Sequence, residues 1–132
     1  MDRETQLAVI VTLVTVALYL GMGARVGILR GKLGVVAPAM TGHPAFERAA
    51  RVHLNTGEQL IAFLPLLWMA TLTFHVWYWL PAAFGAVFLL ARLLYMRLYM
   101  AAPDTRIPAA FLTMLAQVGL FVLAVVGLVK AM

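Results

Sequence analysis

The sequence contains no cysteine and very few charged residues. The absence of cysteine among 132 residues excludes structural disulfides, thiolate metal sites and a cysteine nucleophile, so that any thiol chemistry must use a thiol of the substrate. Charged residues make up 11% of the chain, less than half the share of an ordinary soluble domain, whereas hydrophobic residues make up 64%. These proportions predict an integral membrane protein that forms one compact domain over residues 1–132.

Charged residues are missing from long stretches of the chain, for example from all of residues 59–91. Each apolar stretch is long enough to cross a hydrocarbon core of about 30 Å. We therefore predict an all-α fold, an integral membrane four-helix bundle. The predicted spans cover residues 6–30, 45–74, 80–100 and 107–129.

The basic residues determine the expected topology. The first and third loops and the adjoining helix ends hold most of them: Arg25, Arg30, Lys32, Arg48, Arg51, Arg92, Arg97 and Arg106. The opposite side has only Arg3 and Lys130. The excess of positive charge predicts that the first and third loops are cytoplasmic and that both termini lie on the other side of the membrane.

The net charge of +5 does not indicate a nucleic-acid partner, because the basic residues stand beside apolar spans. Membrane topology and an anionic ligand explain them better. The histidines His43, His53 and His75 are far apart and lack the spacing of metal ligands, so we expect no metal.

A polar cluster covers residues 47–58, at the edge of an apolar span. Arg51, Asn55 and Glu58 share one helical face, and Arg92, Tyr95 and Tyr99 share a face of the next helix at the same depth. The two faces predict one polar cleft between helices. Polar and ionisable groups at this depth are costly, which makes them a candidate functional site.

His53 lies about 160° away from Asn55 on the helical wheel, so it either packs against another helix or reaches the site of a neighbouring subunit. The cleft suits a small molecule with several carboxylates and one ammonium, because arginine binds carboxylates bidentately and Glu58 suits the ammonium. Simpler interpretations remain open. Arg51 could pair with Glu47 or Glu58. Four other basic residues are expected to be structural or to face lipid headgroups: Arg25, Lys32, Arg48 and Arg97.

The motifs that carry these residues are Glu47-Arg48-x-x-Arg51-x-His53-x-Asn55-x-x-Glu58, Arg92-x-x-Tyr95-x-x-x-Tyr99 and Pro103-x-x-Arg106. They resemble those of the MAPEG family, membrane proteins of eicosanoid and glutathione metabolism. The form of the first motif is closer to the microsomal glutathione S-transferases and the prostaglandin-E-forming synthase. The resemblance implies a homotrimer with glutathione bound between neighbouring subunits near the cytoplasmic face. The polar cluster would then form half of a site, and the segment 92–106 of the adjacent subunit would form the other half.

The resemblance also implies roles for individual residues. Arg106 would be catalytic and stabilise the glutathione thiolate. The implied glutathione contacts are Arg30, Arg51, His53, Asn55, Glu58, Arg92, Tyr95 and Tyr99. Two departures from the family pattern argue against particular reactions. Gly31 replaces the second arginine of the leukotriene-forming member, which argues against that member's reaction. Ile107 replaces a serine of other members, so a serine-dependent activation of the thiol is not expected.

The resulting prediction is a membrane-bound glutathione transferase that conjugates glutathione to lipophilic electrophiles from the bilayer, with possible glutathione peroxidase activity. Two alternatives remain open at this point: a glutathione-dependent isomerase of lipid endoperoxides, and a non-enzymatic lipid-binding scaffold. A small multidrug transporter is disfavoured, because such a protein needs an acidic residue in its first span and residues 6–24 contain none.

Overall fold

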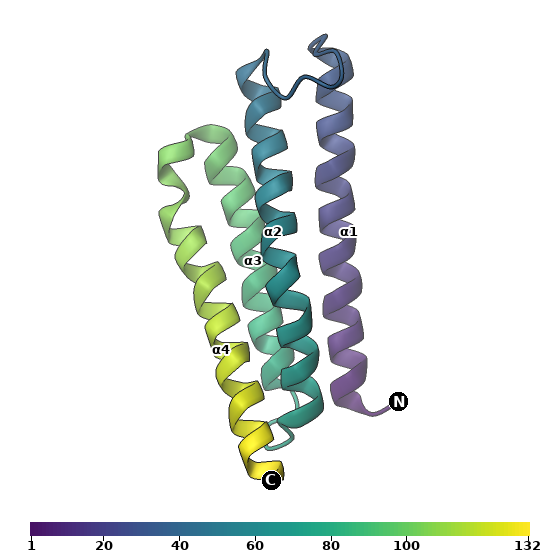
Figure 1. Cartoon of the computed structure of the whole chain (residues 1–132), viewed down its shortest axis with the longest axis vertical. Helices are drawn as coiled ribbons and strands as arrows, with labels where there is room; N and C mark the ends of the chain where they lie inside the picture. Colours follow the sequence, from purple (N-terminus) through teal and green to yellow (C-terminus); the bar gives the residue numbers. More distant parts are fainter.

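The computed structural model describes all of residues 1–132 and consists of helices without any β-strand (Figure 1). The elements in chain order are α1 (Arg3–Lys32), α2 (Pro44–Thr73), α3 (Leu80–Ala101), the short 3-10 helix η1 (Pro103–Arg106) and α4 (Ile107–Ala131). The all-α, four-helix prediction is therefore confirmed.

Helix α2 lies at the centre of the bundle. It packs against α1, α3 and α4, whereas α1 and α4 lie on opposite sides of the α2–α3 pair. Both termini and the turn after α2 lie at one end of the molecule, and the first loop and η1 lie at the other end (Figure 1). This arrangement brings the basic ends of all four helices together.

Local sequence signals explain where α2 begins. The imidazole Nδ1 of His43 accepts a hydrogen bond from the Ala45 amide at 3.2 Å, and Pro44 occupies the first turn. The carboxylate of Glu47, also in the first turn, accepts from the Gly42 amide at 2.9 Å. Glu47 is thus used for the helix start and is not paired with an arginine.

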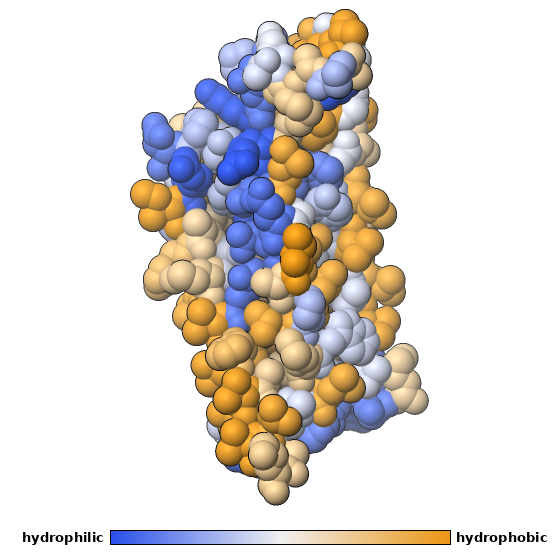
Figure 2. Space-filling model, in the orientation of Figure 1, coloured by the Kyte–Doolittle hydropathy of each residue, from blue (hydrophilic) through white to orange (hydrophobic).

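Three helices, α1, α3 and α4, are long and apolar enough to cross a membrane. The sequence predicted four such spans. Helix α2 has the same length as α1, but the polar cluster occupies its first half and leaves it without an apolar stretch as long as those of the other three helices. Its central position shields part of that cluster from lipid. Large apolar side chains instead cover the outside of the bundle (Figure 2), among them Leu13, Leu20, Ile61, Leu90 and Val129.

The lower half of the bundle is a tightly packed apolar core. The rings of Phe63 in α2 and Phe88 in α3 stack at 3.7 Å between centroids, and neither side chain is exposed. Gly127 lets α4 approach α2 so closely that a Cβ there would lie 2.5 Å from the Thr73 carbonyl. Close contact at small residues is how helices associate where lipid provides no hydrophobic driving force. This rigid half supports the polar half above it.

Candidate active site

Arg92 is the central side chain of the polar half. It is only 1% exposed, and its guanidinium donates to Asn55 Oδ1 at 3.0 Å and to Thr56 Oγ1 at 2.8 Å. The same guanidinium lies 4.2 Å from the centre of the Tyr95 ring. Its Nε is the one enclosed side-chain nitrogen or oxygen of the chain that lacks a hydrogen-bond partner. Arg92 therefore joins α2 to α3 and fixes the orientation of Asn55.

A row of two tyrosines continues from Arg92 toward the end of the bundle. The rings of Tyr95 and Tyr99 stack at 5.5 Å with an interplanar angle of 22°. The guanidinium of Arg106 lies 5.7 Å from the centre of the Tyr99 ring, and it donates to the Pro103 carbonyl at 2.8 Å. Stacking of cations on aromatic rings favours an ordered arrangement of these groups.

Two adjacent hollows open along this row. The first, of about 360 Å³, is lined by Asn55, Gln59, Arg92, Tyr95, Arg106, Ala110, Thr113, Met114 and Gln117. The second, of about 350 Å³, is lined by Pro44, Glu47, Arg48, Arg51, Tyr99 and Pro103. They adjoin where Tyr95 stacks on Tyr99, so we treat them together as one basic cleft. A band of hydrophilic residues on this side of the molecule is visible in Figure 2.

The arginines of the basic cleft have no carboxylate partners. The only ion pair of the chain joins His75 Nδ1 to Glu4 Oε2 at 2.8 Å, at the opposite end of the bundle. The pairing of Arg51 with Glu47 or Glu58, which the sequence left open, is not formed. The Glu58 carboxylate instead accepts a weak hydrogen bond of 3.5 Å from the Asn55 amide. The cleft thus presents arginines without carboxylate partners, and the exposed Glu58 carboxylate lies beside it at Asn55.

The cleft joins α2 and α3 of the same chain, which corrects one expectation. The sequence assigned the segment 92–106 of an adjacent subunit to complete the polar cluster. Asn55 and Arg92, however, are in direct contact within one chain, and Arg51 and Tyr99 line the same hollow. The physical reason is that α2 and α3 are connected by a tight turn and run antiparallel, so their polar ends meet at one end of the bundle.

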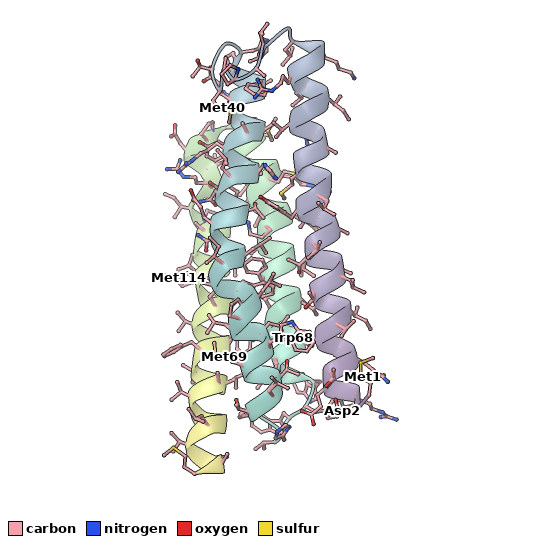
Figure 3. All side chains as sticks on the ribbon, turned by 45° about the vertical axis from the view of Figure 1, so that its right-hand side comes forward. Met1, Asp2, Met40, Trp68, Met69 and Met114 are labelled. Carbon is pink, nitrogen blue, oxygen red and sulfur yellow. The ribbon has the colours of Figure 1, made fainter.

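Three of the predicted glutathione contacts do not line this cleft: Glu58, which lies beside it at Asn55, Arg30 and His53. Arg30 donates to the Ala39 carbonyl at 2.8 Å and lies over the Phe46 ring at 4.6 Å, so it holds the first loop on the helix ends near Met40 (Figure 3). The imidazole of His53 stacks on Tyr19 of α1 at 4.4 Å. The structure thus places His53 against another helix, the first of the two positions that the helical wheel allowed.

Arg48 has a structural contact, in agreement with one of its two expected roles. Its guanidinium donates to the carbonyls of Met100 and Ala101 at 3.0 and 3.3 Å, where α3 ends. These carbonyls lack partners within the helix, and a cation is favourable at this end.

The sequence interpretation missed three polar residues beside or within the cleft: Thr56, Gln59 and Gln117. Thr56 carries one of the two hydrogen bonds of Arg92, and Gln117 contacts Gln59 across α2 and α4. The sequence does contain a signal for Gln117, since it is an isolated glutamine in an otherwise apolar helix.

Comparison with known proteins agrees with the motifs. The sequence model of the MAPEG family matches residues 8–126. Leukotriene C4 synthase of Bos taurus is 34% identical over 128 residues, which cover 97% of this chain and 84% of that protein. Microsomal glutathione S-transferase 2 of Mus musculus is 36% identical over 103 residues, covering 78% and 69%. An uncharacterized protein of Synechocystis is 42% identical over 97 residues, covering 74% and 69%. On this match over nearly its whole length, the chain belongs to the MAPEG family and is a membrane protein.

Proposed function

We propose that the protein is a membrane-bound glutathione transferase that conjugates glutathione to lipophilic electrophiles. The observation that carries the proposal is the basic cleft, in which Arg51, Arg92 and Arg106 have no carboxylate partner. Arg51 and Arg106 are exposed and free to bind an anion, and Arg92 is buried, where a charge without a carboxylate is unfavourable, so the three together favour an anionic ligand. The relatives named for glutathione transfer and for leukotriene C4 synthesis support the same assignment.

The composition of the cleft suits the groups of glutathione. The tripeptide has two carboxylates, one ammonium and one thiol. Arginines bind carboxylates as planar forks, which suits the exposed Arg51 to these groups, whereas the buried Arg92 orients Asn55 toward the ligand. Glu58, beside the cleft at Asn55, is the carboxylate that remains for the ammonium. Each hollow has about the lower volume expected of a small-molecule site, so the two hollows together suit a tripeptide.

Catalysis would depend on ionising the thiol. A free thiol with a pKa near 8.5 is only a few per cent thiolate at neutral pH. Lowering the pKa by about two units requires roughly 2.7 kcal/mol of preferential stabilisation of the thiolate. One guanidinium in a partly dry site supplies an effect of this size. We assign this role to Arg106, with Tyr99 and Tyr95 beside it. The thiolate would then attack an electrophile that enters from the bilayer.

The proposal includes assembly and topology. In a homotrimer, Arg30 and His53 would keep their contacts with Ala39 and Tyr19 of their own chain, and the exposed parts of their side chains would face the cleft of the next subunit. The positive-inside bias places the basic cleft on the cytoplasmic side and both termini on the other. The orientation can be tested directly with a tag at the amino terminus. A reagent that cannot cross the membrane should label this tag on intact cells.

The decisive experiment uses Arg106→Ala with the purified protein in detergent. Conjugation of glutathione to chlorodinitrobenzene should fall about 100-fold in kcat/KM, which corresponds to about 2.7 kcal/mol. The ultraviolet thiolate absorbance of bound glutathione should be lost at neutral pH, whereas calorimetric binding should remain measurable. Arg97→Ala, an exposed arginine outside the cleft, is the control. Unchanged activity of the Arg106 variant would refute the assigned role, and a wild type that does not bind millimolar glutathione would refute the function.

A further inference from the structure

Two glutamines meet at the deep end of the basic cleft. The Gln117 side-chain amide of α4 donates to the backbone carbonyl of Gln59 in α2 at 3.2 Å and to Gln59 Oε1 at 3.0 Å. Both residues line the same hollow as Arg92, Tyr95 and Arg106. The function proposed above assigns no role to this pair.

The two contacts fix which amide atoms face the hollow. A backbone carbonyl can only accept, so the atom of Gln117 that contacts it must be Nε2, and its Oε1 points elsewhere. Gln59 uses its Oε1 to accept from the same Nε2, so its own Nε2 is left over. Gln117 Oε1 and Gln59 Nε2 have no hydrogen-bond partner in the protein. Both atoms are accessible, because Arg92 Nε is the only enclosed polar side-chain atom that lacks a hydrogen-bond partner. The pair thus presents one acceptor and one donor to the cleft.

With Arg106 at the membrane surface, as in the topology proposed above, the glutamine pair lies deep in the membrane. Gln117 follows Arg106 by eleven residues, about 16 Å along the axis of α4. That distance is about half of a hydrocarbon core of about 30 Å. Unsatisfied amide groups are unfavourable at this depth, and polar side chains there mark ligand paths. A single hydroxyl is sufficient to join α2 to α4 by a hydrogen bond. Thr73 does so in the lower half of the same interface, where it donates to the Ala124 carbonyl at 3.2 Å.

We propose that Gln59 and Gln117 form a subsite for a hydroxyl group on the lipophilic electrophile, and that they favour hydroxylated over unsubstituted co-substrates. A hydroxyl donates to Gln117 Oε1 and accepts from Gln59 Nε2, so one group satisfies both free atoms. A carboxylate would face the Gln117 oxygen with no proton to donate. A carbonyl would satisfy only Gln59. This inference depends on the transferase function proposed above.

Because the subsite is deep in the cleft, the hydroxyl of the electrophile binds at a different place from its reactive carbon. The hydroxyl would be held near Gln117 while the reactive carbon lies toward Arg106. In conjugate addition to an unsaturated aldehyde, the glutathione sulfur forms a bond to the β-carbon, the carbon–carbon double bond becomes single, and a proton from solvent adds to the α-carbon. The hydroxyl takes no part in this exchange of bonds, so it reports on binding alone.

The test compares non-2-enal with 9-hydroxynon-2-enal, whose hydroxyl lies at the end of the chain far from the reactive β-carbon, each with glutathione and each corrected for the uncatalysed rate. In Gln117→Leu, kcat/KM for the hydroxylated aldehyde should fall about five- to tenfold relative to nonenal, the effect of losing one hydrogen bond. Gln59→Leu should shift the ratio in the same direction, and it provides the test if Gln117→Leu does not fold. A general loss of packing would lower both rates together and leave the ratio unchanged.

Thr73→Val is the matched control, because it removes an α2–α4 hydrogen bond outside the cleft. The ratio for this variant should equal that of the wild type. An unchanged ratio in both glutamine variants, with both aldehydes still conjugated, would refute the subsite and leave the transferase function intact. Failure of the wild type to conjugate either aldehyde or chlorodinitrobenzene would instead refute the proposed function.

Discussion

Replacing Arg92 by methionine should separate the stability of the bundle from the organisation of its cleft. Arg92 is 1% exposed, and its guanidinium holds Asn55 and Thr56 through hydrogen bonds of 3.0 and 2.8 Å. Methionine has a similar length, fills an irregular space and carries no charge. The substitution therefore removes the contacts to α2 while largely preserving the packing of α3.

The expected magnitudes follow from these contacts. Hydrogen bonds to a charged group each contribute about 1.5–3 kcal/mol. Against this gain stands the desolvation of a buried ion, which is of several kcal/mol, so apolar replacements of buried charges are often close to neutral. We expect the free energy of unfolding to change by less than about 2 kcal/mol. The affinity for glutathione should fall at least tenfold, which corresponds to about 1.4 kcal/mol, because Asn55 loses its fixed orientation and the cleft loses a cation.

A double-mutant cycle with Asn55→Ala tests the positioning role. If Arg92 acts partly through Asn55, the loss of affinity in the double variant should be about tenfold smaller than the product of the two single losses. Calorimetry in detergent measures the affinities, and thermal unfolding in the same detergent measures stability. Arg97→Met is the matched control, since Arg97 is an exposed arginine of the same helix.

Two results would contradict this reasoning. Fully multiplicative losses in the cycle would show that Arg92 and Asn55 contribute to binding independently. A loss of stability well above about 3 kcal/mol, with normal affinity in the protein that remains folded, would show that Arg92 is a structural clamp between the helices.

Two further predictions concern the packing of the lower half. Gly127→Ala should lower the stability by about 1–3 kcal/mol, because its Cβ would lie 2.5 Å from the Thr73 backbone, which cannot move aside as a side chain can. Thermal unfolding measures this loss, and Gly21→Ala, where no atom lies within 4 Å of the new Cβ, should cause none. Phe88→Ala should destabilise by about 3 kcal/mol, the low end for this substitution, since lipid rather than water surrounds the separated helices and mainly the packing against Phe63 is lost. A loss below about 1 kcal/mol in the same assay would show that the cavity refills.

The helices and the polar faces followed from local rules. The runs without charge marked the helices, and the proline and carboxylate of residues 44–47 are local signals for the start of α2, whereas the imidazole cap of His43 came from the structure. The spacing of Asn55 and Arg92 placed both on faces at the same depth, and the two side chains are in fact in contact. Periodicity is sufficient here, because neighbouring antiparallel helices of equal depth bring such faces together.

The partners of individual side chains could not be read in this way. Arg30 and Arg48 carry the same charge as Arg51, yet they bind backbone carbonyls of the first loop and of the end of α3. Every residue has a backbone carbonyl, so no sequence pattern reveals which carbonyls are free to accept a hydrogen bond from a side chain. The stacking of His53 on Tyr19 likewise depends on which helix α1 packs against.

The sequence by itself determined that this protein lies in a membrane as four helices with one basic end, because hydropathy and helical period are properties of single segments. It also determined which faces are polar. Only the tertiary structure decided that α2 and α3 of one chain complete the cleft, that Arg92 is held between Asn55 and Tyr95, and that Gln59 meets Gln117 at its deep end. These are relations between helices, and they depend on how far each helix is rotated and displaced against its neighbours, which close packing at residues such as Gly127 determines.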